Sequence, residues 1–255
     1  MSWSLRTNWE LSSWQNHLSS IYNKVNKQRN VLETFARVTE MATGISRGVR
    51  EDDTKILKKF MPRFLAWLLG LSSQLDIDFE EAVWNSYPGV CPYCRKSISC
   101  TCKLDKDIKS RIKDINEIKK FQAMYPKPTD LVEWVSMFGR IYEDINNNSG
   151  KMKMIGHFLE ELGEVCEIIR FSIVNEDKLK TWAIPFSKNE INLLVKQEFS
   201  DLFAWYCGLA HKMSIDIDSE MKDIYGSLCP ECSKQVCVCD PNKVHKKLRL
   251  GAKKG

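Results

Sequence analysis

The sequence predicts an all-α protein made of two tandem helical repeats, and three observations support this. Only 12 Gly and 8 Pro occur in 255 residues, which disfavours an all-β protein rich in tight turns. Apolar residues recur at spacings of three and four in both halves, and no convincing strand alternation is present. The two halves also match each other, which is typical of a repeat protein.

The match is clearest over a long apolar stretch. Residues 64–78 (FLAWLLGLSSQLDID) align without a gap with residues 202–216 (LFAWYCGLAHKMSID). The tryptophan of each stretch, Trp67 or Trp205, precedes the first cysteine of a cluster by 24 residues. We therefore expect a repeat at 1–103, a linker at 104–127, a second repeat at 128–241 and a basic tail at 242–255.

Each repeat is expected to contain three main helices, then a shorter fourth helix and a cysteine knuckle. The fourth helices are expected at Phe79–Tyr87 and near Ser219–Tyr225. The second repeat carries about fifteen extra residues between Arg170 and Glu198. Because amphipathic helices of this kind cannot bury both faces alone, we expect the two repeats to pack together as a pseudo-dimer.

The linker is expected to form an amphipathic connecting helix. Pro126 and Pro128 would end this helix, and Thr129 or Asp130 could cap the next one. The prediction depends on isoleucines spaced by four, three and three among charged residues, namely Ile108, Ile112, Ile115 and Ile118.

The composition excludes several classes of protein. The longest apolar run, Phe64–Leu71, has eight residues, whereas a membrane span needs about 20. The N-terminus lacks the apolar segment of a secretory signal, so we expect a cytoplasmic protein with no membrane partner. The last fifteen residues hold six of the 38 basic residues and no acid, which leaves 32 basic against 33 acidic residues elsewhere. The net charge of +5 therefore comes from the tail.

Eight of the ten cysteines form two clusters at equivalent positions of the repeats. The patterns C-P-x-C-x₅-C-x-C and C-P-x-C-x₄-C-x-C are typical of closed tetrahedral zinc sites. We therefore expect two structural Zn²⁺ ions, with a redox dithiol or an iron–sulfur cluster as the alternatives. The ligands would be Cys91, Cys94, Cys100 and Cys102 in one site and Cys229, Cys232, Cys237 and Cys239 in the other.

Acidic residues in the second repeat form two helical motifs. Glu160, Glu161 and Glu164 give E-E-x-x-E, and Glu198 and Asp201 give E-x-x-D just before the apolar stretch. Residues three or four apart share a helix face, so antiparallel helices would bring the acids together. Oxygen ligands without His or Cys suit Mg²⁺ or Mn²⁺. A solvated acidic face is the alternative.

These motifs resemble the MazG-like pattern of the all-α nucleoside triphosphate pyrophosphohydrolases. The matching elements read EELGE, EFSD and MSIDID, within about residues 131–225. The resemblance implies a Mg²⁺-dependent hydrolase that releases a nucleoside monophosphate and pyrophosphate, in a chain that could associate into a homo-oligomer. It also implies Mg²⁺ ligands at Glu161, Glu164, Glu198 and Asp201, with Glu160 as a ligand, a supporting group or the base that orients water.

Three further residues are candidates for binding the nucleotide substrate. Lys222 lies after the "ID" turn, where the resemblance implies a phosphate contact, and Lys196 lies close to the acids in sequence. Trp182 lies in the extra segment and could stack on a base. Solvated lysines and an aromatic anchored on the core are the alternatives.

The first repeat lacks the acids. The positions that align with the acids of the second repeat are occupied by Arg37, Val38, Met41, Phe60 and Arg63. We therefore expect a degenerate first repeat that cannot bind Mg²⁺ in the same way. A different class of function remains open, a non-catalytic zinc-containing scaffold or a nucleic-acid-binding protein. We do not expect nucleic acid as a partner, because basic residues beside the knuckles are sparse.

Overall fold

The computed structural model describes residues 9–102, 110–174 and 176–240, and the predicted all-α class is confirmed over these residues. The basic tail at 242–255 lies outside them. Among the described residues, no helix is both long and apolar enough to cross a membrane. The helices of the described residues are α1 (Leu11–Asn26), α2 (Val31–Glu51), α3 (Thr54–Gln74), α4 (Phe79–Ser86), α5 (Ile115–Met124), α6 (Leu131–Ile141), α7 (Glu143–Asn148), α8 (Lys151–Ser172), α9 (Glu176–Thr181), α10 (Lys188–Lys212) and α11 (Ile217–Tyr225).

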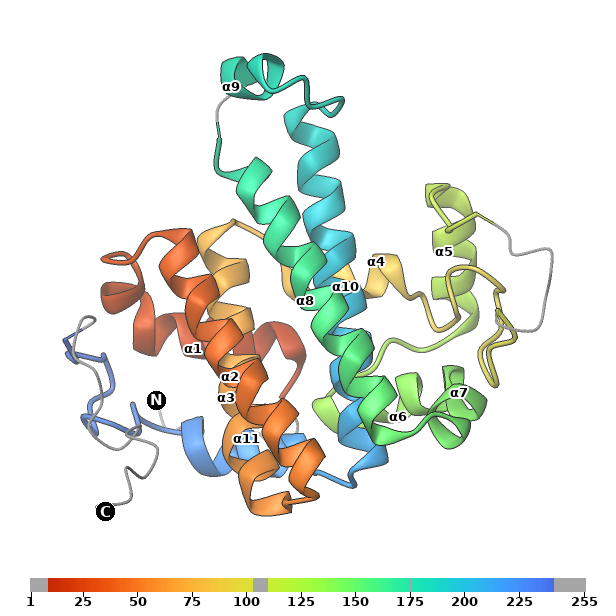
Figure 1. Cartoon of the computed structure of the whole chain (residues 1–255). Coiled ribbons are helices and arrows are strands. Elements are labelled where there is room, and N and C mark those ends of the chain that lie inside the picture. The colour runs from red at the N-terminus through yellow and green to blue at the C-terminus, as the bar shows by residue number, and fades with distance from the viewer. Residues whose placement is uncertain (1–8, 103–109, 175, 241–255) are drawn as a thin grey trace.

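Four long helices form the centre of the molecule (Figure 1). Helix α2 packs along α3, α8 packs along α10, and α2 also contacts α8. The short fourth helices cross between the halves: α4 of the first half packs on α10, and α11 of the second half packs on α3. Each half therefore covers a long helix of the other.

The two halves share one hydrophobic core. The ring of Phe64 lies 5.1 Å from that of Phe158 and 5.3 Å from that of Tyr206, between ring centroids. The Tyr206 hydroxyl donates a hydrogen bond of 3.0 Å to the Met61 carbonyl. Because these buried contacts join helices of both halves, neither half could keep its core without the other.

The connecting helix is shorter than the sequence predicts. Ile112 is buried ahead of the helix, and its backbone N–H donates to the Pro92 carbonyl at 3.0 Å. The side chain of Asp114 then caps α5, which begins at Ile115. The predicted start was wrong because capping by Asp114 and the bond to Pro92 outweigh the isoleucine spacing. Ile108 lies outside the described residues.

One of the two predicted capping residues is confirmed. Asp130 caps α6 by accepting a hydrogen bond from the Glu133 N–H at 2.8 Å. The extra residues of the second half form α9 and the first turns of α10, which Ser187 caps. Figure 1 shows α9 at the outer end of the α8–α10 pair.

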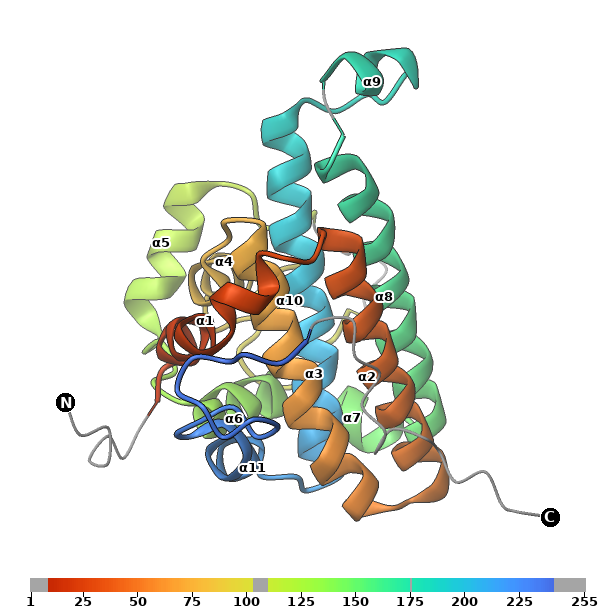
Figure 2. The ribbon, with the colours of Figure 1, turned by 90° about the vertical axis from the view of Figure 1, so that its left-hand side faces the viewer.

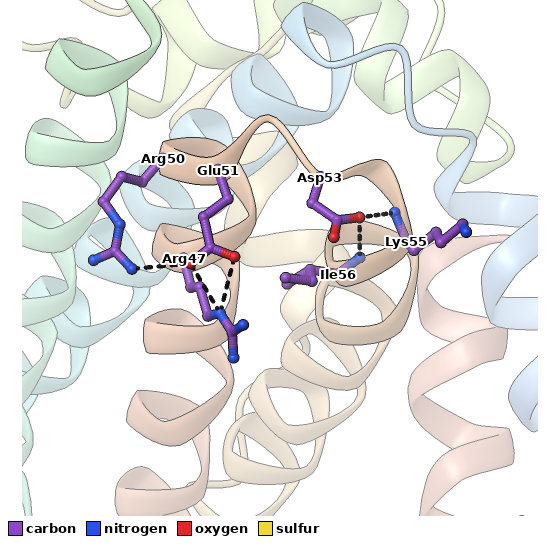
Figure 3. A network of polar contacts seen from close by, with 6 residues as sticks. All are labelled: Arg47, Arg50, Glu51, Asp53, Lys55 and Ile56. Atoms are coloured by element: carbon purple, nitrogen blue, oxygen red, sulfur yellow. Dashed lines mark hydrogen bonds and ion pairs between the residues drawn. The ribbon is translucent and has the colours of Figure 1, made fainter. Parts of the chain in front are cut away.

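The turn between α2 and α3 is fixed by charged groups (Figure 3). Glu51 accepts hydrogen bonds from Arg47 at 3.1 Å and Arg50 at 3.2 Å. The Asp53 carboxylate caps α3 through two backbone N–H groups of its first turn. Exposed ion pairs of this kind stabilise little, so the cap is the more important contact here.

Each cysteine knuckle is joined to the first helix of the other half. The N–H of Cys100 donates to the Ile141 carbonyl at 2.7 Å, and the N–H of Cys237 donates to the Ile21 carbonyl at 2.8 Å. Figure 2 shows the segment after α11 lying beside α1. The two bonds connect positions that are equivalent in the repeat alignment.

Gly44 allows α2 and α3 to approach each other closely, which gives a test of this packing. A Cβ atom at Gly44 would lie 2.2 Å from the Phe60 ring, whereas one at Gly156 of α8 would meet nothing within 4 Å. We expect Gly44→Ala to destabilise the protein by about 1–3 kcal/mol through overpacking.

The matched control is Gly156→Ala, which should stabilise α8 by about 0.5–1 kcal/mol through helix propensity. Chemical denaturation of both variants and the wild type measures the difference. A stabilised Gly44→Ala protein would contradict the close packing of these two helices.

Candidate metal centres

Three carboxylates meet where α8 packs on α10. Glu161 and Glu164 lie three residues apart on one face of α8, and Glu198 faces them from α10. One oxygen from each lies within 4.8 Å of the others. We call this set the acidic cluster, and it is the arrangement that the two sequence motifs predicted for these three residues.

Glu161 is the most constrained member of the acidic cluster. Its Oε1 accepts a hydrogen bond of 3.1 Å from the Trp205 indole N–H. Its Oε2 is buried and has no hydrogen-bond partner among the described residues. Burial raises the pKa of Glu161 to about 8, and the charges of Asp201, Glu164 and Glu198 add to the shift. A buried carboxylate oxygen without a partner is costly, and a bound cation would remove this cost.

Glu198 is in a similar position. Burial raises its pKa to about 7, assisted by the charges of Asp201 and Glu164 and by a hydrogen bond with Glu164. Without a cation, the acidic cluster would therefore retain protons near neutral pH. A hard divalent ion such as Mg²⁺ would favour the ionised carboxylates and give Glu161 Oε2 a partner, so the residues present fit such an ion.

Asp201 lies beside the acidic cluster but is engaged elsewhere. Arg111 forms two hydrogen bonds with it, at 2.5 and 2.9 Å, and the Tyr87 hydroxyl donates a third at 2.6 Å. Burial opposes the charge of Arg111, but hydrogen bonds and the charge of Asp201 outweigh it and raise the pKa of Arg111. In this structure Asp201 is therefore an ion-pair partner, and its role as a fourth ligand stays a prediction.

Glu160 points in a different direction from the acidic cluster. Its carboxylate is 3.0 Å from His157 Nδ1, and 64% of its side chain is exposed. The His157 ring stacks on Trp205, with 4.7 Å between centroids. Glu160 is thus joined to the cluster only through the His157 and Trp205 rings, and a role as base stays a prediction.

The predicted substrate residues are scattered. Lys196 precedes Glu198 by two residues, so the two side chains lie on different faces of α10. Lys222 forms an ion pair with Asp218 on its own helix. Trp182 follows α9 directly and is 52% exposed. Their roles in binding a nucleotide stay predictions.

Both cysteine clusters have a geometry compatible with zinc. Each set of four sulfur atoms lies within 4.8 Å, and five of the S···S distances within the sets run from 3.4 to 4.0 Å. A tetrahedral ion with Zn–S bonds of about 2.3 Å requires S···S edges of about 3.8 Å. The two knuckles also contain the same kind of turn. The Cys91 N–H donates to the Lys96 carbonyl in the first, and the Cys229 N–H donates to the Lys234 carbonyl in the second.

Comparisons with protein-family models, with curated proteins and with solved structures found no match for this chain. The interpretation of its sites therefore depends on their geometry and chemistry.

Three residues beside the acidic cluster were missed by sequence reasoning. Trp205 and Tyr87 align with Trp67 and Tyr225 of the other half, and this pairing was a usable signal. Arg111 carried no such signal, because it lies in the linker and reaches Asp201 only through the tertiary fold.

The raised pKa values predict how stability depends on pH. An acid whose folded pKa lies above its unfolded value contributes stability below the unfolded pKa, and this is lost as pH rises through the folded pKa. With zinc saturating and no Mg²⁺, Tm should fall between about pH 5 and pH 8, because in that range the folded protein keeps protons on Glu198 and Glu161 that the unfolded chain has already released.

Glu161→Gln should flatten this decline. Mg²⁺ added to the wild-type protein at the upper end of the pH range should restore the Tm that it has at the lower end. Glu167 lies exposed on the same helix, so Glu167→Gln is the matched control and should leave the slope unchanged. Melting curves across this range measure the effect. If Tm depends on pH equally steeply in the wild type and in Glu161→Gln, the carboxylates of the acidic cluster do not repel one another as proposed.

The knuckles predict the zinc content and the effect of losing zinc. We expect two zinc ions per chain and one after Cys229→Ser with Cys232→Ser, while Cys166→Ser should keep both. Loss of one ion should lower Tm by about 10 °C, because a site worth several kcal/mol is removed.

The Cys237 N–H donates a hydrogen bond to the Ile21 carbonyl of α1. When zinc is lost from this knuckle, amide hydrogen exchange should therefore rise first in α1. Metal analysis, melting and exchange on one preparation test this. Exchange confined to α11 would show that the knuckle does not support α1.

Proposed function

We propose that this chain is a Mg²⁺-dependent pyrophosphohydrolase of nucleoside triphosphates, releasing a nucleoside monophosphate and pyrophosphate. The observation that carries the proposal is the acidic cluster, three carboxylates within 4.8 Å with one buried oxygen lacking a partner among the described residues. Such a set suits a hard cation, and hard cations are the usual partners of polyphosphates in enzymes. The type of reaction is inferred from the resemblance of the acidic motifs to the MazG-like pattern.

In this proposal Glu161, Glu164 and Glu198 hold the ion. Mg²⁺ bound there would supply charge neutralisation for the phosphates of the substrate. The Trp205 N–H orients Glu161 by binding its other oxygen, and the stacked His157 ring limits the movement of Trp205. Near neutral pH, Glu161 and Glu198 would release protons when the ion binds, because their pKa values are raised.

Asp201 is proposed to position the site rather than to bind the ion directly. Arg111 and Tyr87 fix both of its oxygens, and the Arg111 and Asp201 side chains are only 10% and 16% exposed. Removing one partner of a buried ion pair leaves the other charge uncompensated. Asp201→Asn should therefore disturb stability as well as activity, unlike a change at an exposed acid.

We also propose that the chain is a pseudo-dimer of MazG-like bundles. The crossed packing of α4 on α10 and α11 on α3 supports this, as do the matched hydrogen bonds of the two knuckles. The clustered cysteines favour a reducing compartment such as the cytoplasm. A scaffold of the same fold without catalysis is the second candidate, and it is favoured by the zinc-compatible clusters alone.

The test is pyrophosphate release from a panel of nucleoside triphosphates with and without Mg²⁺. We expect release only with Mg²⁺, and Glu161→Gln or Glu198→Gln should lower kcat/KM at least ~100-fold, the range for losing a group that stabilises developing charge. Both variants should fold at least as well as the wild type, because the substitution relieves repulsion among the acids.

Glu167→Gln on α8 removes the same charge from an exposed position and should retain full activity. Release of orthophosphate instead of pyrophosphate would show that a different bond is cleaved. If every nucleotide is inert, or if Glu161→Gln turns over at the wild-type rate, the enzymatic proposal fails and the scaffold remains.

A further inference from the structure

A basic pocket lies in the first half beside the positions that align with the acidic cluster of the second half. Its volume is about 240 Å³, and its basic lining residues are Arg29, Arg37, Lys59 and Arg63. In the repeat alignment, Arg37 takes the position of Glu160, and Arg63 that of Asp201. Two acidic positions that flank the acidic cluster are thus arginines in the first half, while the cluster's own positions hold Val38, Met41 and Phe60.

The surroundings of the two sites correspond. Trp67 lines the basic pocket at the position that Trp205 holds beside Glu161. Tyr225 reaches the pocket from the opposite half, as Tyr87 reaches Asp201. Tyr225 is 5% exposed, so it forms a fixed part of the wall. The basic pocket is therefore a built site between the halves.

The basic side chains outnumber the acids that line the pocket. Four basic residues face two acidic ones, of which Glu40 is paired with Arg37 at 2.7 Å. Burial lowers the pKa of Arg29, and the positive charge of Arg37 lowers it further. Holding like charges together costs free energy, which an anion in the pocket would offset.

The excess charge has a competing explanation, since three cysteines of the second knuckle also line the pocket and would carry negative charge as zinc thiolates. The first knuckle provides a comparison. There Arg95 pairs with Glu117 at 3.0 Å, and the neighbouring Arg111 pairs with Asp201. The first knuckle therefore has its arginines matched by carboxylates, and a surplus of cations is not a requirement of this kind of knuckle.

A wider cavity adjoins the basic pocket. This cavity has a volume of about 840 Å³ and shares Asn26 and Arg29 with the basic pocket. The guanidinium group matches phosphate oxygens in a forked geometry, and ligand sites of this combined size hold nucleotide-sized molecules. We propose that the basic pocket binds the phosphate group of a phosphorylated small molecule, whose remaining part lies in the wider cavity. This site is separate from the acidic cluster and does not depend on the proposed hydrolysis.

The experiment is titration calorimetry on the full zinc-loaded chain without Mg²⁺. Inorganic pyrophosphate, a nucleoside monophosphate and a nucleoside triphosphate serve as probes. Omitting Mg²⁺ leaves the acidic cluster repulsive to phosphates, so binding there is suppressed. We expect one saturable site per chain, weakened by salt. Arg37→Gln with Arg63→Gln should lower the affinity about 100-fold, the loss expected for two charged hydrogen-bond donors.

The matched control is Arg47→Gln with Arg50→Gln, which removes the same charge from the exposed end of α2 (Figure 3). It should bind as the wild type does. If the Arg37 and Arg63 variant loses zinc or fails to fold, Lys59→Glu tests the pocket from an exposed position and should still weaken binding.

The outcomes separate the explanations. Tighter binding of a nucleotide than of pyrophosphate supports a contribution from the wider cavity, and equal binding supports recognition of the phosphate alone. The proposal is overturned if no probe binds saturably, if both arginine double variants lose the same affinity, or if Lys59→Glu binds as the wild type does. Any of these would leave the arginines as counter-ions of the knuckle.

Discussion

The repulsion among three carboxylates held between α8 and α10 is the constraint on which the second half depends. Their separation is imposed by apolar packing, because Phe158, Leu162 and Phe199 on the same helices are buried in the shared core. The free energy that opposes the repulsion is therefore the burial of that core. The helices that carry these acids cannot move apart without disrupting that core. Retained protons or a bound cation would relieve the repulsion, and only a cation does so with the carboxylates ionised, which is why the acidic cluster is interpreted as an ion site.

The knuckles support the first helix of each half. Each is bonded to the first helix of the opposite half, through the Ile141 and Ile21 carbonyls. Metal bound by four thiolates would thus stabilise α6 and α1 as well as the loops that carry the cysteines. Tyr87 and Tyr225 each precede a knuckle by a few residues. The contact of each knuckle with the opposite half therefore also places the tyrosine against that half. The knuckles therefore contribute to both sites indirectly, by positioning residues that line them.

Much of this arrangement could be predicted from the sequence, but some could not. The three-residue spacing placed Glu161 and Glu164 on one face, and the repeated cysteine spacing by itself indicated two metal centres. The pairing of Asp201 with Arg111 was inaccessible, because it joins residues 90 positions apart across a linker. The start of α5 was misplaced for a local reason, since one capping aspartate outweighed a regular isoleucine pattern. Spacing within one helix is thus more predictable than contacts between elements.

The two halves illustrate how one scaffold can present opposite charges. At the positions of Glu161 and Glu164 the first half has Val38 and Met41, which are buried and extend the core. At the position of Asp201 it has Arg63, which donates a hydrogen bond to the Lys59 carbonyl. Asp201 instead needs Arg111 and Tyr87 to fix it. In both halves the aligned apolar residues lie in the shared core, so the charged positions around it can differ between the halves. A phosphate could then be bound through a cation in one half and directly by arginines in the other.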